Sequence, residues 1–377
     1  MSKKSVLLVV PALGIGGQER IAVNTAIALL DQYDVKIAVF ENKEVKYDSP
    51  CEVINLELPP KRGLVSKVLN TFKRILKLSK IRRMCHSDIV MSLGNSANLV
   101  NALSSIISPG KSICAIHGFA EVKKTLPMRI IMSLSDKVIC IAKSMQDSLL
   151  SLFKNNSKTV LIENGYDINS IVEMSTNNQD VEISKNALIS VGRLDKVKGF
   201  DRLIKAFAIV RQTKDDLQLV IIGKGDLREE LIALVKSEGV EDCVRFLGYK
   251  KNPYAYMRQS GIYVLSSRNE GFPNALIEAL ACELPIISID CQSGPREILS
   301  SEYSSERIKG ISEEQYGVLV EECESDERNA ELLANAILSL VNNPEKMQEY
   351  RSRGRSRAYQ FSNEVYCRKL TELIESL

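Results

Sequence analysis

The stretch that decides the fold is residues 187–211, which read ALISVGRLDKVKGFDRLIKAFAIVR. Its first five residues are mostly apolar, and such an unbroken run is typical of a strand that is buried on both faces. A loop with two glycines follows, and residues 200–211 then place apolar side chains at helical spacing. A buried strand, a glycine turn and a helix together form the repeating unit of a parallel α/β sheet.

The same unit recurs along the chain. Short apolar runs predict strands at Ser5–Val10, Val35–Phe40, Ile89–Ser92, Ser112–Ile116, Lys137–Ile141, Thr159–Ile162, Ala187–Val191, Gln218–Ile222, Val244–Leu247, Ile262–Leu265 and Pro285–Ser288. Helical stretches lie between them, so two series of these units predict two Rossmann-like, doubly wound α/β domains. The polar segment 167–184 indicates a linker or surface segment between the series. We expect domains over residues 1–170 and 171–360, with a helix over 361–377 that can pack back on the N-terminal domain.

The composition is that of a globular protein and narrows the class of function. The chain has 377 residues, of which 45% are hydrophobic and 26% are charged. The net charge is only +3, and aromatic residues make up 6% with no Trp, which argues against binding to nucleic acid. Residues 1–170 nevertheless hold 23 Lys and Arg against 14 Asp and Glu, whereas residues 171–377 hold 27 against 33. Net charges of +9 and −6 suggest two domains with different tasks.

The cysteines and the N-terminus indicate the compartment. The nine cysteines stand singly, without a CxxC pair, and with only two histidines a zinc site is not indicated. The N-terminus lacks the pattern of a signal peptide, and no stretch approaches the ~20 apolar residues that span a bilayer. We therefore expect a cytoplasmic protein with free cysteines.

Two glycine-rich turns follow predicted strands. Residues 11–20 read PALGIGGQER, and glycine there lets backbone N–H groups approach an anion or a sugar, or simply permits a tight turn. Gly14 and Gly16 fit the dinucleotide fingerprint, but Glu19 stands where its third glycine belongs, which disfavours NAD. The segment IGKGD at 222–226 is typical of an ordinary strand–helix turn.

The loop at 192–199 collects positive charge. Arg193, Lys196 and Lys198 lie between Gly192 and Gly199, directly before a predicted helix. Cations beside a flexible backbone at a helix start suit a diphosphate. A basic loop that is merely solvated is the alternative.

Residues 266–278, SSRNEGFPNALIE, carry the most informative pattern. Glu270 lies in the loop after a predicted strand, at the sheet edge where α/β proteins bind ligands. Glu278 lies on the helix that follows, and the amides of Gly271–Ala275 are donors at the helix start. One carboxylate can contact a reacting sugar, while the other can accept hydrogen bonds from both hydroxyls of a ribose. Two solvated glutamates are the alternative.

In their order, the glycine loop, Gly-Arg-x-Asp-x-x-Lys-Gly and Glu-x7-Glu resemble the GT-B-fold retaining glycosyltransferases of family 4. The resemblance covers nearly the whole chain and is most specific from Leu188 to Ile298. It implies two domains that face a cleft, with the acceptor mainly on the first domain and the nucleotide-sugar on the second.

The resemblance also implies roles for residues. Glu270 and His117 would be the catalytic residues, with Glu270 contacting hydroxyls of the donor sugar and His117 near the transferred sugar. The diphosphate would be held by Arg193 and Lys198, and the ribose by Glu278. The donor-binding residues are expected to be Gly16, Gly17, Arg193, Lys198, Tyr249, Gly271, Phe272, Pro273, Asn274, Ala275 and Glu278. Neither a metal nor a cofactor is expected, in agreement with the lack of an Asp-x-Asp motif.

The implied reaction is a retaining, metal-independent transfer of a hexose or N-acetylhexosamine. The expected donor is a UDP-sugar, with GDP-mannose as second choice. The expected acceptor is a glycan linked to undecaprenyl diphosphate, in bacterial lipopolysaccharide O-antigen or capsule biosynthesis. A nucleotide-sugar epimerase of related fold and a catalytically idle nucleotide-sugar-binding homologue remain as alternatives.

Residues 61–87 carry nine Lys and Arg and no Asp or Glu, with apolar residues at helical spacing. A basic amphipathic helix of this kind lies on an anionic membrane or binds an acidic partner; a packed surface helix with a solvated basic face is the alternative. We expect peripheral attachment to the inner face of the cytoplasmic membrane through this helix, and no binding to nucleic acid.

Overall fold

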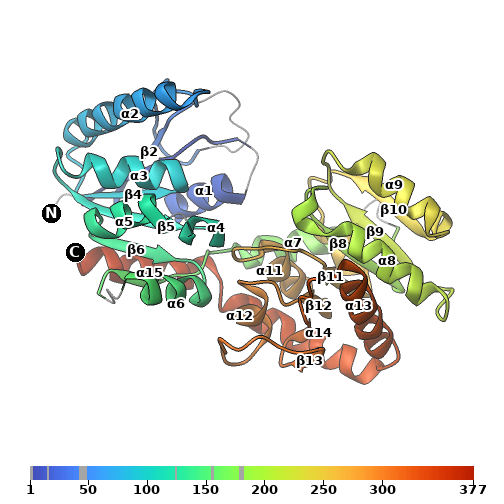
Figure 1. Cartoon of the computed structure of the whole chain (residues 1–377). Coiled ribbons are helices and arrows are strands. Elements are labelled where there is room, and N and C mark those ends of the chain that lie inside the picture. Colours follow the sequence, from blue (N-terminus) through green and yellow to red (C-terminus); the bar gives the residue numbers. More distant parts are fainter. Residues whose placement is uncertain (1–2, 15–16, 42–48, 124, 154–156, 178–181) are drawn as a thin grey trace. The chain divides into compact units, whose positions relative to one another are not determined.

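The computed structural model describes residues 3–14, 17–41, 49–123, 125–153, 157–177 and 182–377. It divides the chain into two units, which Figure 1 shows in the colours of the sequence. Unit 1 comprises Met1–Tyr166 and Ser362–Leu377, and unit 2 comprises Asp167–Phe361. These limits lie within a few residues of those expected from the sequence. Each unit is described by itself below.

Unit 1 contains a parallel sheet, whose order in the described residues is β3-β2-β1-β4-β5-β6-β7. Its strands are β1 (Ser5–Val10), β2 (Asp34–Val39), β3 (Val53–Asn55), β4 (Ile89–Leu93), β5 (Lys111–Ile116), β6 (Lys137–Cys140) and β7 (Thr159–Leu161). Its helices are α1 (Gly17–Leu30), α2 (Leu64–Met84), α3 (Asn95–Ser104), α4 (Phe119–Val122), α5 (Thr125–Leu134), α6 (Lys143–Phe153) and α15 (Asn363–Glu375).

Among its described residues, unit 2 contains a second sheet of order β10-β9-β8-β11-β12-β14-β13, in which only the β13–β14 pair is antiparallel. Its strands are β8 (Ala187–Val191), β9 (Gln218–Ile222), β10 (Val244–Gly248), β11 (Ile262–Leu265), β12 (Ile286–Ile289), β13 (Ile311–Glu314) and β14 (Gly317–Val320). Its α-helices are α7 (Ile168–Thr176), α8 (Phe200–Arg211), α9 (Arg228–Ser237), α10 (Tyr254–Gln259), α11 (Asn274–Ala281), α12 (Pro295–Leu299), α13 (Asp326–Val341) and α14 (Pro344–Tyr359). Two short 3₁₀ helices are η1 (Lys196–Lys198) and η2 (Glu241–Cys243).

The central strands explain why the sheets are covered on both faces. Every residue of β1 is buried, and successive side chains enter different cores. Val6, Leu8 and Val10 belong to one cluster, whereas Leu7 and Val9 belong to the other. This alternation follows from the two-residue repeat of a strand and requires helices on both sides.

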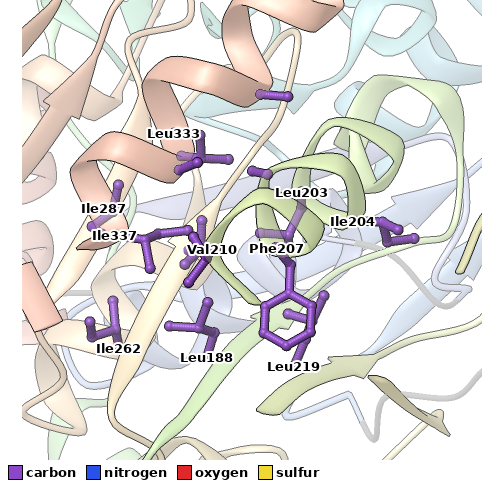
Figure 2. Close-up of a cluster of buried hydrophobic side chains, with 14 of the residues drawn as sticks. Leu188, Leu203, Ile204, Phe207, Val210, Leu219, Ile262, Ile287, Leu333 and Ile337 are labelled. Atoms are coloured by element: carbon purple, nitrogen blue, oxygen red, sulfur yellow. The ribbon is translucent and has the colours of Figure 1, made fainter. Parts of the chain in front are cut away.

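The core of unit 2 is built where α8 and α13 pack on the sheet. Figure 2 shows Phe207 and Val210 of α8 together with Ile337 of α13 and Leu188 of β8. All four side chains are buried. The stretch at 187–211 therefore supplies both a central strand and the helix that covers it, as its apolar pattern predicts.

The prediction of two doubly wound α/β domains is confirmed. In each unit the strand order reverses beside a central strand, between β1 and β4 and between β8 and β11. Loops at the carboxyl ends of these strands form the ligand-binding edge of such sheets. This edge carries most of the residues singled out in the sequence.

The segment 167–184, expected to be a linker or surface segment, is helical in its first half. Residues 168–176 form helix α7, and Asp167 caps it by accepting a hydrogen bond from Ser170 N at 2.9 Å. Ile168 and Ile171 are buried, and α7 packs against α10 within unit 2. A short helix with one narrow apolar stripe has too little periodicity to stand out in a polar segment.

Candidate active site

The turn that follows β8 is shaped by a cap and a glycine. The Asp195 side chain accepts hydrogen bonds from Val197 N at 3.1 Å and Lys198 N at 3.2 Å, which starts η1. Gly199 ends this turn with φ 63°, and a Cβ there would meet Ser266 O at 2.2 Å. Only glycine allows the turn to lie so close to the neighbouring loop.

Two predicted site residues from distant segments meet at this edge. Lys198 Nζ lies 2.7 Å from Glu270 Oε1, and Ser267 Oγ donates to the same oxygen at 2.6 Å. The Glu270 side chain is only 11% exposed. The ion pair joins the loops after β8 and β11, which are neighbours in the sheet. A cation and a carboxylate are thus held side by side.

Helix α11 begins directly after this loop. A loop before α12 supports its start, because Ser293 Oγ donates to Gly271 O at 2.7 Å. The side chains of Phe272 and Pro273 are buried, and Phe272 packs edge-to-face on Phe361. For these two residues only the backbone is therefore suited to meet a ligand. Asn274 and Ala275, which open the helix, are partly exposed.

Glu278 lies on α11 and is buried. Its Oε1 accepts a hydrogen bond from Tyr254 Oη at 3.4 Å. Burial, and secondly the charge of Glu278, raise the pKa of Tyr263 far above its ordinary value, so this tyrosine stays a neutral hydroxyl. Glu278 thus lies close to two tyrosines.

Two further predicted donor residues stand apart from the Lys198–Glu270 pair. The Arg193 side chain is 80% exposed and pairs with Asp195 Oδ2 at 3.0 Å. Tyr249 follows β10 and is 61% exposed, with Lys224 Nζ 5.9 Å from its ring centre. In the part of the chain that the structure describes, no hydrogen bond or ion pair joins either of them to Lys198 or Glu270.

The Gly-x-Gly turn after β9 does more than the sequence suggested. A Cβ on Gly223 would lie 1.8 Å from Gly192 O, and one on Gly225 would lie 2.3 Å from Leu194 O. The backbone also pairs, because Leu194 N donates to Lys224 O at 2.9 Å. These glycines let the turn support the 192–199 loop. The packing depends on the neighbouring strand and cannot be read from the local sequence.

In unit 1, His117 follows β5, at the carboxyl edge of that sheet. Burial lowers the pKa of its imidazole to about 4, so the ring is neutral near pH 7. Its Nε2 is buried and has no hydrogen-bond partner among the described residues. A neutral ring with one unused nitrogen suits a hydroxyl of a ligand. Gly17 is the first residue of α1, and Gly16 lies outside the described residues.

No group of three or more His, Cys, Asp and Glu among the described residues is arranged to hold a metal ion. No described helix is both long and apolar enough to cross a bilayer. A cavity of ≈ 870 Å³ in unit 2 is lined by residues such as Lys185, Ser260 and Glu283, which precede strands, so it lies at the opposite sheet edge from the candidate site.

Several known proteins with similar sequences are glycosyltransferases. An N-acetylgalactosamine-N,N'-diacetylbacillosaminyl-diphospho-undecaprenol 4-alpha-N-acetylgalactosaminyltransferase of Campylobacter jejuni is 27% identical over 364 residues, covering 93% of both chains. The amylovoran biosynthesis glycosyltransferase AmsD of Erwinia amylovora is 27% identical over 311 residues, covering 79% of this chain and 84% of AmsD.

The fold also matches solved structures. The structure of Anabaena HepE in complex with UDP and glucose superposes with a TM-score of 0.76 at 19% identity, covering 99% of this chain and 100% of HepE. The family model for glycosyltransferase family 4 matches residues 15–170, and the model for glycosyl transferases group 1 matches residues 173–357. The chain is therefore a glycosyltransferase of the GT-B fold, whose first part belongs to family 4 and whose second part belongs to group 1.

Proposed function

We propose that the chain transfers a hexose or N-acetylhexosamine from a UDP-sugar to a lipid-linked glycan acceptor, with retention and without a metal. The observation that carries the proposal is the 2.7 Å contact between Lys198 Nζ and Glu270 Oε1. It brings a cation and a carboxylate together at the carboxyl ends of β8 and β11. The cation can compensate the negative charge of a departing diphosphate, and the carboxylate can accept hydrogen bonds from the sugar hydroxyls.

The proposed chemistry uses residues of unit 2. Lys198, together with Arg193, offsets the charge that grows on the leaving diphosphate, and the N-terminus of α11 adds backbone donors. Glu278 accepts hydrogen bonds from the ribose hydroxyls, and Glu270 orients the sugar by accepting hydrogen bonds from its hydroxyls. The bond from C1 to the acceptor oxygen forms on the face from which the diphosphate leaves. The acceptor proton passes to the departing phosphate oxygen.

The relatives support the proposed substrates. The Campylobacter relative is named for an acceptor linked to undecaprenol through diphosphate, and the HepE structure holds UDP and glucose. We therefore propose a UDP-sugar as donor, GDP-mannose as the second choice, and a role in a bacterial surface polysaccharide such as O-antigen or capsule.

Donor binding is tested by thermal stabilisation with UDP-sugars and GDP-mannose, with and without EDTA. A ligand that binds only the native state raises stability, and about 3 kcal/mol is expected at a hundredfold excess over its Kd. Lys198→Met should remove most of the stabilisation. Lys205→Met breaks another ion pair of unit 2, Lys205–Glu327 at 3.2 Å, and should change nothing. Loss of stabilisation in EDTA would contradict metal independence.

Turnover separates the proposal from its alternatives. Glu270→Ala should lower transfer to a lipid-linked acceptor at least a hundredfold, because the sugar loses its orienting carboxylate. Transfer at the wild-type rate by this variant would refute the assigned role. Conversion of a UDP-sugar without any acceptor would instead indicate an epimerase, and donor binding without turnover would indicate an idle homologue.

We further propose that α2 docks on an anionic membrane. Its exposed large apolar side chains are Leu64, Val65, Val68, Leu69, Phe72, Leu76 and Met84. Lys67, Lys73 and Lys80 are exposed on the same helix. Apolar side chains that enter the lipid, beside cations that meet its headgroups, are the pattern of an interfacial helix. Anionic lipid attraction is worth roughly 1 kcal/mol per nearby cation.

Three basic side chains of α2 contact other parts of unit 1. Arg74 donates twice to Leu58 O, and Lys77 Nζ donates to Leu56 O at 2.6 Å. Arg82 is fully buried and donates to Pro109 O and Gly110 O, and burial lowers its pKa to about 10. These three cations hold α2 on the rest of unit 1. Arg74 and Arg82 are buried and not available to a lipid, whereas the Lys77 side chain stays 43% exposed.

Flotation with vesicles tests the docking surface. The wild type should float with vesicles that contain phosphatidylglycerol and remain behind with pure phosphatidylcholine. Leu69→Ser with Phe72→Ser, and Lys73→Gln with Lys80→Gln, should each reduce binding to anionic vesicles at least tenfold. Leu152→Ser removes an exposed leucine of α6 and is the matched control. Equal binding by all variants would refute the proposal, and concentration-dependent dimerisation lost in Leu69→Ser/Phe72→Ser would point to a second copy as the occupant.

A further inference from the structure

The turn that carries Lys198 is joined to the loop that carries Glu270 along three successive carbonyls. Lys196 O accepts from Arg268 Nη1 at 2.8 Å, Val197 O accepts from Arg268 N at 2.8 Å, and Lys198 O accepts from Ser266 Oγ at 3.0 Å. The two segments are some seventy residues apart in the sequence. Arg268 supplies two of the three bonds, one from its backbone and one from its side chain.

Carboxylates from two helices fix the guanidinium of Arg268. Asp201 of α8 accepts two hydrogen bonds, at 2.9 Å from Nη1 and 2.6 Å from Nη2. Asp326, the first residue of α13, accepts from Nη2 at 2.7 Å. Hydrogen bonding to Asp201 is the largest cause that raises the pKa of Arg268, with burial opposing it. The fork geometry of arginine serves a carbonyl and two carboxylates at once.

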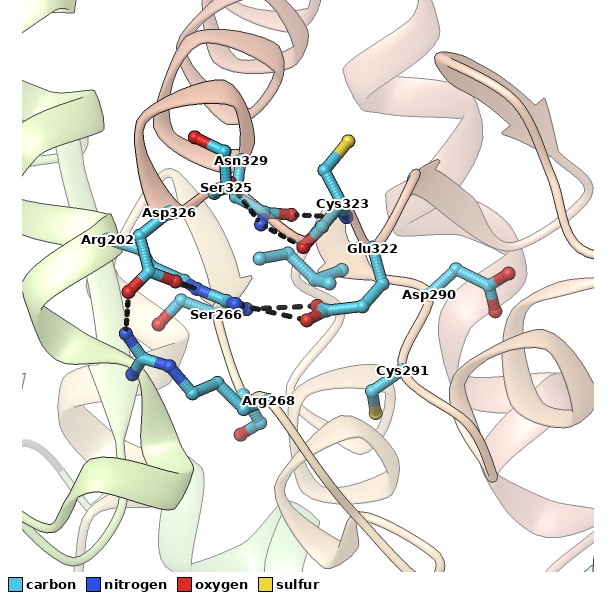
Figure 3. A network of polar contacts seen from close by, with 12 residues as sticks. Arg202, Ser266, Arg268, Asp290, Cys291, Glu322, Cys323, Ser325, Asp326 and Asn329 are labelled. Carbon is cyan, nitrogen blue, oxygen red and sulfur yellow. Dashed lines mark hydrogen bonds and ion pairs between the residues drawn. The ribbon is translucent and has the colours of Figure 1, made fainter.

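A second arginine, Arg202, also binds Asp326. Arg202 is 4% exposed, donates from Nε to the other oxygen of Asp326, and pairs in bidentate fashion with Glu322 at 2.9 and 3.0 Å. Figure 3 shows Asp326 between Arg202 and Arg268, with Glu322 on the far side of Arg202. The network ties α8, α13 and the 266–270 loop into one polar block.

We propose that Arg268 is a positioning residue that holds Lys198 opposite Glu270, so that the diphosphate meets a preformed cation. The inference rests on the proposed function, in which Lys198 binds the donor diphosphate. The Arg268 guanidinium binds Lys196 O and the carboxylates of α8 and α13, and among the described residues no hydrogen bond joins it to the side chain of Lys198 or Glu270. Its effect on the donor therefore passes through the turn at 196–198.

The test compares UDP with uridine, which lacks the diphosphate, by titration calorimetry. Arg268→Gln should raise the Kd of UDP about tenfold, because a displaced Lys198 loses one charged contact with the diphosphate and such a contact is worth about a factor of ten in affinity. The Kd of uridine, which has no diphosphate, should rise less than twofold. Lys198→Met should show the same split. The double variant should bind UDP no more weakly than Lys198→Met alone, because both changes remove one interaction. Arg268→Lys should recover part of the UDP affinity.

Arg328→Gln is the matched control, because it breaks an exposed Arg328–Glu331 pair on α13 and should leave both Kd values unchanged. If Arg268→Gln does not fold, Asp201→Asn carries the test and should weaken UDP in the same direction. Wild-type affinity for UDP in these variants, equal losses for UDP and uridine, or full additivity with Lys198→Met would overturn the inference. A wild-type protein that binds no UDP would refute the proposed donor instead.

Discussion

His117 illustrates how burial sets the chemistry of a single side chain. Its pKa is lowered to about 4 by burial, whereas an unfolded histidine titrates near 6.5. Between these values the unfolded chain binds the extra proton, so the stability of the folded state must fall as the pH is lowered. At neutral pH the ring is uncharged and can hydrogen-bond a hydroxyl, but it cannot act as a cation.

This predicts a pH-dependent stability that a substitution removes. Between pH 7 and pH 4.5 the wild type should lose about 2 kcal/mol of unfolding free energy because of His117. His117→Gln keeps a polar side chain that does not titrate, so its loss over the same range should be smaller by that amount. Denaturant melts at the two pH values measure the difference. Parallel losses in both proteins would mean that the imidazole is not buried as described.

Gly199 is the residue on which the packing of the donor loop depends. Its φ of 63° is unfavourable for other residues, and a Cβ would meet Ser266 O at 2.2 Å. Gly239 provides the comparison, because it has φ 67° and nothing within 4 Å of an added Cβ. Gly199→Ala should cost about 3 kcal/mol of stability and weaken UDP, whereas Gly239→Ala should cost only about 1 kcal/mol. Equal costs in thermal melts would show that the two loops are not in contact.

Elements differ in how well the sequence predicts them. The strands Ser5–Val10, Ala187–Val191 and Ile262–Leu265 are predicted without error, because they are apolar runs buried on both faces. β3 was missed because it is three residues long and lies half-exposed at a sheet edge. β13 was missed because its four residues read Ile-Ser-Glu-Glu, with a single apolar side chain, at the other edge of the sheet. β14 was missed too, although its four residues are buried and it lies inside the sheet, because its apolar run is short and begins with glycine. Most buried strands therefore carry their own signal, whereas β14 and the edge strands do not.

The residues of the candidate site also differ in how well the local sequence predicts their roles. Lys198, Glu270 and Glu278 lie in local patterns that chemistry can interpret, a basic glycine loop and a strand–turn–helix. Arg268 and Ser266 lie in the same stretch, but their role is to hold a turn some seventy residues away. Such a role depends on the order of strands in the sheet, and no local pattern encodes it.

At the scale of the whole molecule, the chain crosses from unit 1 to unit 2 and returns. Helix α15 follows α14 of unit 2, yet it completes the core of unit 1 with buried Tyr366, Leu370, Leu373 and Ile374. Thr25 of α1 and Tyr366 share a buried hydrogen bond at 2.8 Å. Helix α15 thus completes the core of the unit that also carries the basic helix α2. The two units have separate cores, so they need not unfold together.

The separate cores predict two transitions in scanning calorimetry that respond to different changes. UDP should raise the transition of unit 2 alone, because the proposed diphosphate and ribose contacts lie there. Leu370→Ala should lower the transition of unit 1 by several degrees, since an emptied leucine site costs about 3 kcal/mol. Glu372→Ala changes an exposed residue of the same helix and should leave both transitions in place. A single transition that shifts with either change would show instead that the two cores unfold as one cooperative unit, and α15 would then stabilise the donor site as well as the unit that it completes.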